Sequence, residues 1–107
     1  MKALFLCSRN RLRSPTAEEV FAAYPGVETA SAGLNHDADT PLTSDLVEWA
    51  DVIFVMERVH GSKLKERFGP QLKGKRVVCL GIPDKYAFMD PALVRLLNKQ
   101  VPRHLRD

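Results

Sequence analysis

The most informative residues of the chain follow a short apolar run near its beginning and read Cys7-Ser8-Arg9-Asn10-Arg11-Leu12-Arg13-Ser14. The apolar run, residues 2–6, is typical of a strand buried in a parallel sheet. A helix start follows, for which we expect Ser14 as the N-cap and Pro15 at the first helical position. Residues 7–14 are therefore predicted to form a loop between the carboxyl end of a strand and the amino end of a helix.

A loop in this position suits a tetrahedral oxyanion, because backbone amides and the positive end of the helix dipole point into it. The same field favours the thiolate over the thiol at Cys7, and the nearby Arg13 acts in the same direction. The planar guanidinium of Arg13 can hold two phosphate oxygens at once. Asn10 suits a sharp turn because asparagine tolerates left-handed backbone angles. The pattern predicts a phosphate-binding loop with a cysteine nucleophile, and the alternative is a half-buried structural cysteine at a strand end.

The rest of the chain alternates between strand-like and helix-like segments, as α/β folds do. We expect strands at 2–6, 27–30, 51–56 and 75–80, helices at 14–24, 44–50, 60–68 and 91–99, and loops at 34–42 and 81–89. Thr43 or Ser44 is expected to cap the second helix. The predicted fold is α/β, with a four-stranded parallel sheet and helices on both faces. Ligands of such sheets bind beyond the carboxyl ends of the strands, where Cys7 lies.

Length and composition agree with this fold. A chain of 107 residues is long enough for one hydrophobic core and not for two, so we expect a single domain over residues 1–107. No segment approaches membrane-spanning length, and the apolar run before Cys7 is too short for a signal peptide. We therefore expect a cytoplasmic protein with no membrane partner.

Neither the cysteines nor the histidines suggest a structural cross-link or a metal site. Cys7 and Cys79 do not form a disulfide framework, and a reactive thiol requires a reducing compartment. His36, His60 and His104 are scattered, and each is expected on the surface or in a loop. No metal and no cofactor are expected.

The basic residues fall into two classes. Residues 63–67 carry two lysines and an arginine, and are most simply a solvated helix face. Arg9, Arg11 and Arg13 would instead surround a bound oxyanion. The net charge of +3 and these three arginines favour an anionic substrate.

Residues 7–18 resemble the phosphate loop and first helix of the low-molecular-weight protein tyrosine phosphatase family. The pattern of that family is a cysteine, five residues, an arginine and then a serine or threonine, with asparagine at the fourth position. Residues 31–33, 51–56 and 90–91 agree with the same family in order. The chain is most similar to a shorter, less characterised branch of predicted tyrosine phosphatases. The resemblance implies a phosphotyrosine phosphatase I-like fold, and hydrolysis of phosphomonoesters through a cysteinyl-phosphate intermediate without a cofactor.

The resemblance also implies roles for individual residues. Cys7 is the nucleophile, Arg13 holds the phosphoryl group, and Asp90, next to Pro91, is the general acid. Asp84 lies in the same predicted loop and is the rival acid, although we favour Asp90. The remaining residues expected to bind the phosphoryl group are Ser8, Arg9, Asn10, Arg11, Leu12 and Ser14.

Two of these residues have a competing structural role. Asp90 directly before Pro91 is also a good N-cap for the last helix. Ser14 is either an N-cap alone or the donor of a hydrogen bond to the Cys7 thiolate, which would make that sulfur a better leaving group.

The chain departs from the family at positions that contact the substrate. Ser8 and Arg9 replace an apolar residue and a glycine, and Arg11 replaces an aliphatic residue. Ala92 and Leu93 stand where longer relatives place tyrosines that sandwich the aromatic ring of the substrate. The expected partner is therefore a phosphorylated protein or a small phosphomonoester, and nucleic acid is not expected.

Two other functions remain open from the residues. An arsenate reductase of related fold would need a relay of further cysteines, and Cys79, which we expect to be buried at a strand end, is insufficient alone. A non-catalytic module that binds phosphate esters would use the basic loop without turnover. We predict turnover, as a cysteine-dependent phosphatase.

Overall fold

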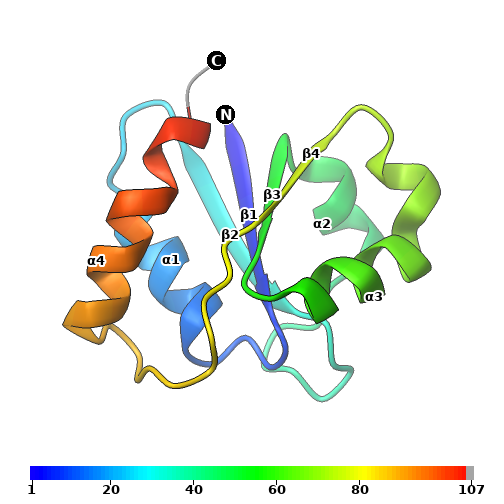
Figure 1. The fold of residues 1–107 in the computed structure, drawn as a ribbon. Helices are drawn as coiled ribbons and strands as arrows, with labels where there is room; N and C mark the ends of the chain where they lie inside the picture. Colours follow the sequence, from blue (N-terminus) through cyan, green and yellow to red (C-terminus); the bar gives the residue numbers. More distant parts are fainter. Residues whose placement is uncertain (106–107) are drawn as a thin grey trace.

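Four parallel strands form the centre of the computed structural model, which describes residues 1–105 (Figure 1). The strands are β1 (Lys2–Cys7), β2 (Glu28–Gly33), β3 (Val52–Val55) and β4 (Arg76–Cys79). Their spatial order is β2-β1-β3-β4, and every neighbouring pair is parallel. The predicted four-stranded parallel sheet is confirmed.

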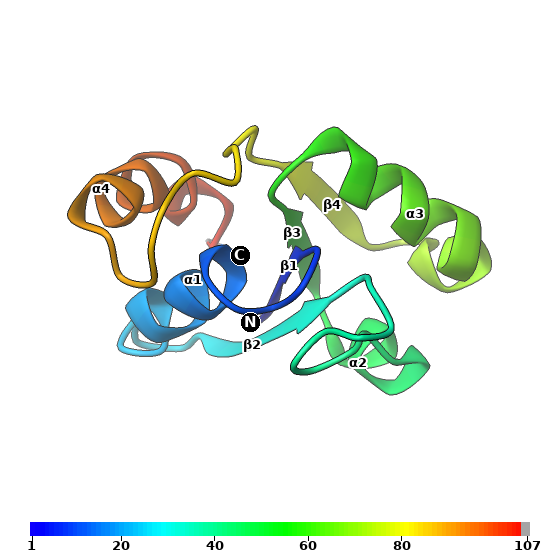
Figure 2. The same ribbon diagram turned by 90° about the horizontal axis from the view of Figure 1, so that it is seen from below.

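Helices cover both faces of the sheet, as predicted (Figures 1 and 2). They are α1 (Arg13–Phe21), α2 (Ser44–Trp49), α3 (Arg58–Phe68) and α4 (Pro91–Gln100), with short 3-10 turns at Gly69–Leu72 and Pro102–His104. Helices α1 and α4 pack on one face, where Phe21 and Leu97 are buried, and α2 and α3 on the other, where Val47 and Leu64 are buried. Within residues 1–105, no helix is both long and apolar enough to cross a membrane.

The central strand β1 is fixed by burial on both of its faces. Ala3 and Phe5 point into the cluster under α1 and α4, and Leu4 and Leu6 into the opposite cluster. The Phe5 ring stacks on Phe54 with centroids 5.0 Å apart. Each fully buried side chain of this size contributes about 1.5–3 kcal/mol. The end of β1, where Cys7 stands, is therefore anchored by the core.

The strand order places a crevice at a definite position. The chain moves from β1 outward to β2, and then returns to the other side of β1 for β3. At such a reversal the two flanking loops diverge and leave an opening beyond the carboxyl ends of the strands. Here these ends are Cys7 on β1 and Val55 on β3, so the opening lies beside Cys7.

The predicted start of the first helix is wrong. The helix begins at Arg13 with Leu12 at the N-cap position, and no side chain caps it. Ser14 is fully buried, and its hydroxyl contacts Cys7 instead. Pro15 is the third residue of the helix, where it is tolerated because the first-turn N–H groups have no intrahelical partner.

Other boundaries of the strands and helices also differ from the prediction. β2 continues to Gly33 rather than ending at residue 30, since its polar residues pair with β1 along the whole length of that strand. Thr43 caps α2, as expected, by accepting a hydrogen bond from Leu46 N–H at 3.3 Å. The expectation that Cys79 is buried is wrong, because β4 is an edge strand and this side chain is exposed.

We expect Gly33→Ala to destabilise the protein by about 1–3 kcal/mol, because an added methyl group overpacks this position. A Cβ atom at Gly33 would lie 2.5 Å from the Ala38 Cβ and 2.6 Å from the carbonyl oxygen of Ser8. Urea unfolding measures the loss. Gly69→Ala is the matched control, since a Cβ there meets nothing within 4 Å. Equal stability of the two variants would contradict the tight approach of β2 to the loop at Ser8.

Candidate active site

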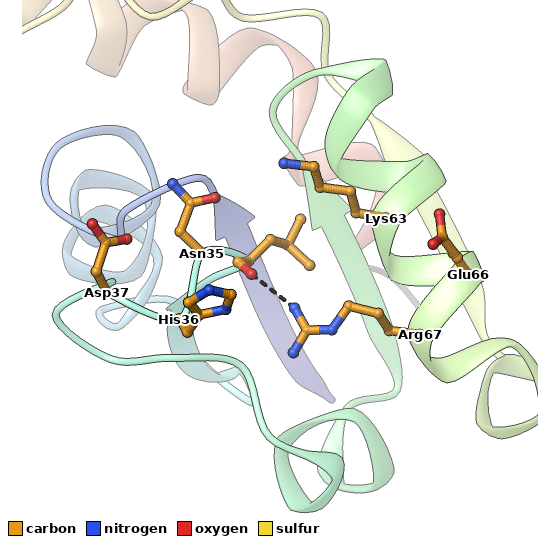
Figure 3. Close-up of a pocket in the computed structure, with 7 residues that line it drawn as sticks. Asn35, His36, Asp37, Lys63, Glu66 and Arg67 are labelled. Carbon is orange, nitrogen blue, oxygen red and sulfur yellow. Dashed lines mark hydrogen bonds between the residues drawn. The ribbon is translucent and has the colours of Figure 1, made fainter.

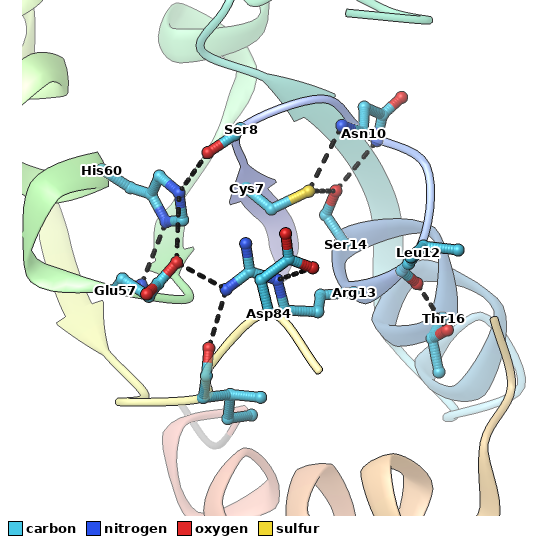
Figure 4. A network of polar contacts seen from close by, with 11 residues as sticks. Cys7, Ser8, Asn10, Leu12, Arg13, Ser14, Thr16, Glu57, His60 and Asp84 are labelled. Atoms are coloured by element: carbon cyan, nitrogen blue, oxygen red, sulfur yellow. Dashed lines mark hydrogen bonds and ion pairs between the residues drawn. The ribbon is translucent and has the colours of Figure 1, made fainter. Parts of the chain in front are cut away.

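A pocket of about 270 Å³ opens where β1 passes into α1, and we call it the cradle. It is lined by Cys7, Ser8, Arg9, Arg11, Leu12, Arg13 and Asp84. Six of these seven belong to the predicted phosphate-binding loop. The other two loop residues, Asn10 and Ser14, are buried and hydrogen-bonded around the sulfur (Figure 4).

The sulfur of Cys7 lies at the base of the cradle, and its residue is only 3% exposed. The backbone N–H of Asn10 donates to Sγ at 3.3 Å, from a left-handed conformation with φ of 57°. The Asn10 side-chain amide donates to Ser14 Oγ at 3.0 Å, and Ser14 Oγ lies 3.0 Å from Sγ. Because the Ser14 oxygen already accepts from Asn10, its own hydrogen is available to the sulfur. Two donors, the Asn10 N–H and the Ser14 hydroxyl, are therefore directed at the sulfur.

Arg13 is buried and held in one orientation. Its Nη1 donates to Glu57 Oε2 and to the carbonyl oxygen of Ile82, each at 2.8 Å. Among residues 1–105, the Nε and Nη2 edge makes no hydrogen bond, and Nε lies 3.8 Å from Asp84 Oδ1. This edge presents two parallel N–H groups, the arrangement that binds two oxygens of a phosphoryl group.

His60 is the least expected member of the site. The sequence indicated a surface or loop histidine, but His60 is 1% exposed within α3. Its Nδ1 accepts a hydrogen bond from Glu57 N–H at 3.0 Å, so the neutral ring carries its hydrogen on Nε2. Nε2 in turn donates to Ser8 Oγ at 2.9 Å. Ser8 thus has its hydroxyl hydrogen left to donate into the cradle.

Burial lowers the pKa of His60 to about 4, and the charge of Arg13 acts in the same direction. His60 is therefore neutral near pH 7. Glu57 raises the pKa of His60, but its effect is smaller than that of burial and that of Arg13. A neutral ring is what Nδ1 requires to accept the hydrogen bond from Glu57 N–H.

We expect acidification from pH 7 to pH 5 to destabilise the protein by about 2 kcal/mol through His60 alone. In the unfolded chain His60 has its ordinary pKa of 6.5, against about 4 when folded. Between these values the unfolded state binds more protons, so stability falls as the pH falls. Urea unfolding of wild type and His60→Gln at both pH values checks this. The variant should lose about 2 kcal/mol less than wild type between the two pH values, and an equal loss would contradict a buried neutral histidine.

The two candidate acids occupy different places. Asp84 lines the cradle. Asp90 is the N-cap of α4, where its Oδ1 accepts from Ala92 N–H at 2.9 Å, and it is not among the residues that line the cradle. The segment from Ile82 to Met89, which carries Asp84, is hydrogen-bonded to α1 at both ends. Arg13 holds the carbonyl of Ile82, and Thr16 Oγ1 accepts from Met89 N–H at 2.9 Å.

The outer rim of the cradle carries two exposed ion pairs. Arg11 Nε lies 3.2 Å from Asp39 Oδ1, and Arg9 Nη2 lies 4.0 Å from Asp37 Oδ2. Exposed pairs of this kind contribute about 0–1 kcal/mol. A substrate anion can therefore compete for either guanidinium at small cost.

Sequence reasoning missed Glu57 and His60, which fix Arg13 and Ser8. A weak signal was present, because Glu57 follows the buried run 52–56 at the same sheet edge as Cys7.

Cys79 is exposed at the end of β4 and does not line the cradle. Among residues 1–105, no group of three or more histidine, cysteine or carboxylate side chains is arranged to hold a metal ion.

Comparisons with known proteins agree with this geometry. No family model matches the chain, and no curated protein matches it. Solved structures match over nearly its whole length. The tyrosine phosphatase Wzb from Escherichia coli K30, in complex with phosphate, is 26% identical, with 96% of this chain and 94% of that chain covered and a TM-score of 0.75. The tyrosine phosphatase amsI from Erwinia amylovora is 28% identical, with coverages of 92% and 86% and a TM-score of 0.71. The low molecular weight protein tyrosine phosphatase SP-PTP from Streptococcus pyogenes, 16% identical, shares the fold with coverages of 99% and 93% and a TM-score of 0.79.

Proposed function

We propose that this chain, which has the fold of the low-molecular-weight protein tyrosine phosphatases, hydrolyses phosphate monoesters through a cysteinyl-phosphate intermediate. One observation carries the proposal. The Cys7 sulfur lies at the base of a pocket of about 270 Å³ with two hydrogen-bond donors on it. Beside it, Arg13 makes no hydrogen bond through Nε or Nη2 within residues 1–105, and Asp84 Oδ1 lies 3.8 Å from Nε. Donors of this kind also stabilise the charge that develops on the phosphoryl oxygens during transfer.

In the first step the Cys7 thiolate attacks phosphorus in line with the leaving oxygen. The S–P bond forms as the P–O bond to the leaving group breaks, and an acid supplies a proton to the departing oxygen. The Nε and Nη2 edge of Arg13 holds two equatorial oxygens. The Ser8 hydroxyl, oriented by His60, donates to the phosphoryl group from the opposite wall.

In the second step water attacks the same phosphorus, and the S–P bond breaks to release inorganic phosphate. The residue that gave its proton in the first step now accepts one from water. Ser14 donates to the departing sulfur and stabilises it as a thiolate. The enzyme returns to its starting state without a cofactor.

We assign the acid and base role to Asp84 rather than to Asp90. A general acid must reach the leaving oxygen directly or through one water. Asp84 lines the cradle beside Arg13, whereas the carboxylate of Asp90 is engaged at the start of α4. The preference for Asp90 on sequence alone rested on the resemblance of Asp90-Pro91 to the general acid of the family, and on a loop that begins at the same sheet edge as Cys7.

Phosphotyrosine is the first substrate to test, because the matched structures include the tyrosine phosphatases Wzb and amsI. Leu12, 39% exposed at the rim, offers an apolar contact for the ring. We place the protein in the cytoplasm, since a thiolate nucleophile persists only in a reducing compartment. Phosphorylated proteins and small phosphomonoesters are both within this proposal.

Hydrolysis of p-nitrophenyl phosphate near pH 6 tests the proposal. We expect steady turnover, competitive inhibition by vanadate, and a phosphoryl group on the Cys7 peptide after acid quenching. A non-catalytic phosphate-binding module would instead bind the ester stoichiometrically and release no product. That result would overturn the proposed hydrolysis.

A further inference from the structure

A second, larger hollow lies beside the cradle, and we call it the side cavity. It has a volume of about 650 Å³ and lies between the segment after β2 and helix α3 (Figure 3). It is lined by Leu34, Asn35, His36, Asp37, Lys63, Glu66 and Arg67. The mechanism above uses none of these residues.

The side cavity and the cradle share a wall at the end of β1. The backbone N–H groups of Leu34 and Asn35 donate to the carbonyl oxygens of Cys7 and Ser8, each at 3.0 Å. On the opposite wall, His60, which holds Ser8, lies one helical turn before Lys63. A molecule held by its phosphoryl group in the cradle can therefore extend over Ser8 into the side cavity.

The groups that point into the side cavity are mainly cationic. Lys63 and Arg67 are four residues apart, on one face of α3, and both side chains extend toward the segment after β2 (Figure 3). Arg67 Nη1 donates to the carbonyl of Leu34 at 2.7 Å, a neutral acceptor that leaves the charge of the guanidinium uncompensated. Lys63 forms no ion pair within residues 1–105.

The acidic residues of the lining are directed elsewhere. The Glu66 carboxylate points away from the cavity (Figure 3), and Asp37 lies 4.0 Å from Arg9. The positive charge of Lys63 also reaches the cradle, since it is one of the charges that lower the pKa of His60. The charged groups left to face the side cavity are therefore Lys63 and Arg67.

We propose that the side cavity binds a second anionic group of the substrate, a carboxylate or phosphate carried near the phosphoryl ester, with Lys63 as its main contact. This inference rests on the proposed hydrolysis at Cys7. The cavity suits one such group rather than a polyphosphate chain, because within residues 1–105 its lining offers two cationic side chains, Lys63 and Arg67. An acidic residue beside a phosphorylated residue, or the second phosphate of a small bisphosphate, supplies the required chemistry.

The test compares kcat/KM for matched substrates with and without the second anion. One pair is a phosphotyrosine peptide flanked by glutamates and the same peptide flanked by glutamines. The other pair is a sugar bisphosphate and its monophosphate. We expect the anionic member of at least one pair to be preferred about fivefold, the effect of one semi-exposed charge pair. The pair that shows the preference identifies the source of the anion.

Lys63→Met should abolish this preference and leave kcat/KM for p-nitrophenyl phosphate within about twofold of wild type. Lys65→Met is the matched control, because Lys65 lies on the same helix with the same charge and does not line the side cavity. The inference is overturned if Lys63→Met slows p-nitrophenyl phosphate and the acidic substrate equally, or if both variants act alike. Absence of any p-nitrophenyl phosphate turnover by wild type would instead defeat the proposed hydrolysis itself.

Discussion

Cys7→Ser is expected to reduce hydrolysis of p-nitrophenyl phosphate by about 10⁴-fold or more, because a serine hydroxyl at this position has no adjacent base to activate it. The donors around the sulfur remain in place, since the Asn10 side-chain amide and Ser14 Oγ are hydrogen-bonded to each other. Binding of inorganic phosphate should therefore persist within about tenfold of wild type, as the cradle loses only one negative charge at its base. Turnover is measured spectrophotometrically and phosphate binding by calorimetry.

Cys79→Ser is the matched control for this substitution. Cys79 is exposed at the end of β4 and does not line the cradle, so its replacement should leave turnover unchanged. Retention of full activity by Cys7→Ser would remove Cys7 as the nucleophile. Equal loss in both variants would show that the effect is not specific to the sulfur at the base of the cradle.

Asp84→Asn is expected to lower kcat by about 10²-fold or more, because the amide cannot protonate the leaving oxygen or accept a proton from water. The loss should be greatest for phenyl phosphate, whose leaving group is more basic, and smaller for p-nitrophenyl phosphate. This dependence on the leaving group distinguishes an acid from a residue that only positions Arg13. Steady-state kinetics with both esters provides the measurement.

Asp90→Asn is the matched control for the acid. Asparagine is an N-cap as good as aspartate, so α4 should start normally and kcat should remain within about twofold of wild type. The reverse order, with Asp90→Asn the slower enzyme, would return the acid role to Asp90. It would also require the carboxylate of Asp90 to leave its hydrogen bond with Ala92 during turnover.

The fold and the base of the site follow from local patterns in the sequence. The apolar run before Cys7 must be buried on both faces, and only the central strand of a parallel sheet offers that environment. The base of the site lies within residues 7–14, where Asn10, Ser14 and the Cys7 sulfur contact one another. Because these contacts join residues that are close in the chain, the spacing of the residues in the sequence predicts them.

The partners from other elements were not predictable in the same way. Glu57 and His60 reach Arg13 and Ser8 across 44 and 52 residues, and no spacing rule connects them. The choice between Asp84 and Asp90 depends on the path of a loop, in which Met89 adopts a left-handed backbone with φ of 59°. Sequence reasoning about Ser14 failed at the helix start because burial beside the sulfur outweighed its preference for the cap.

The anchoring of the segment from Ile82 to Met89 at both ends has a consequence for the catalytic cycle. Hydrogen bonds attach both of its ends to α1, the helix that follows Cys7. The segment is therefore poorly suited to close as a lid over a bound ester. Binding and release of an ester then leave Ile82 and Met89 attached to α1. The mouth of the cradle then stays open to water, and water is the reactant that the second step of the proposed hydrolysis consumes.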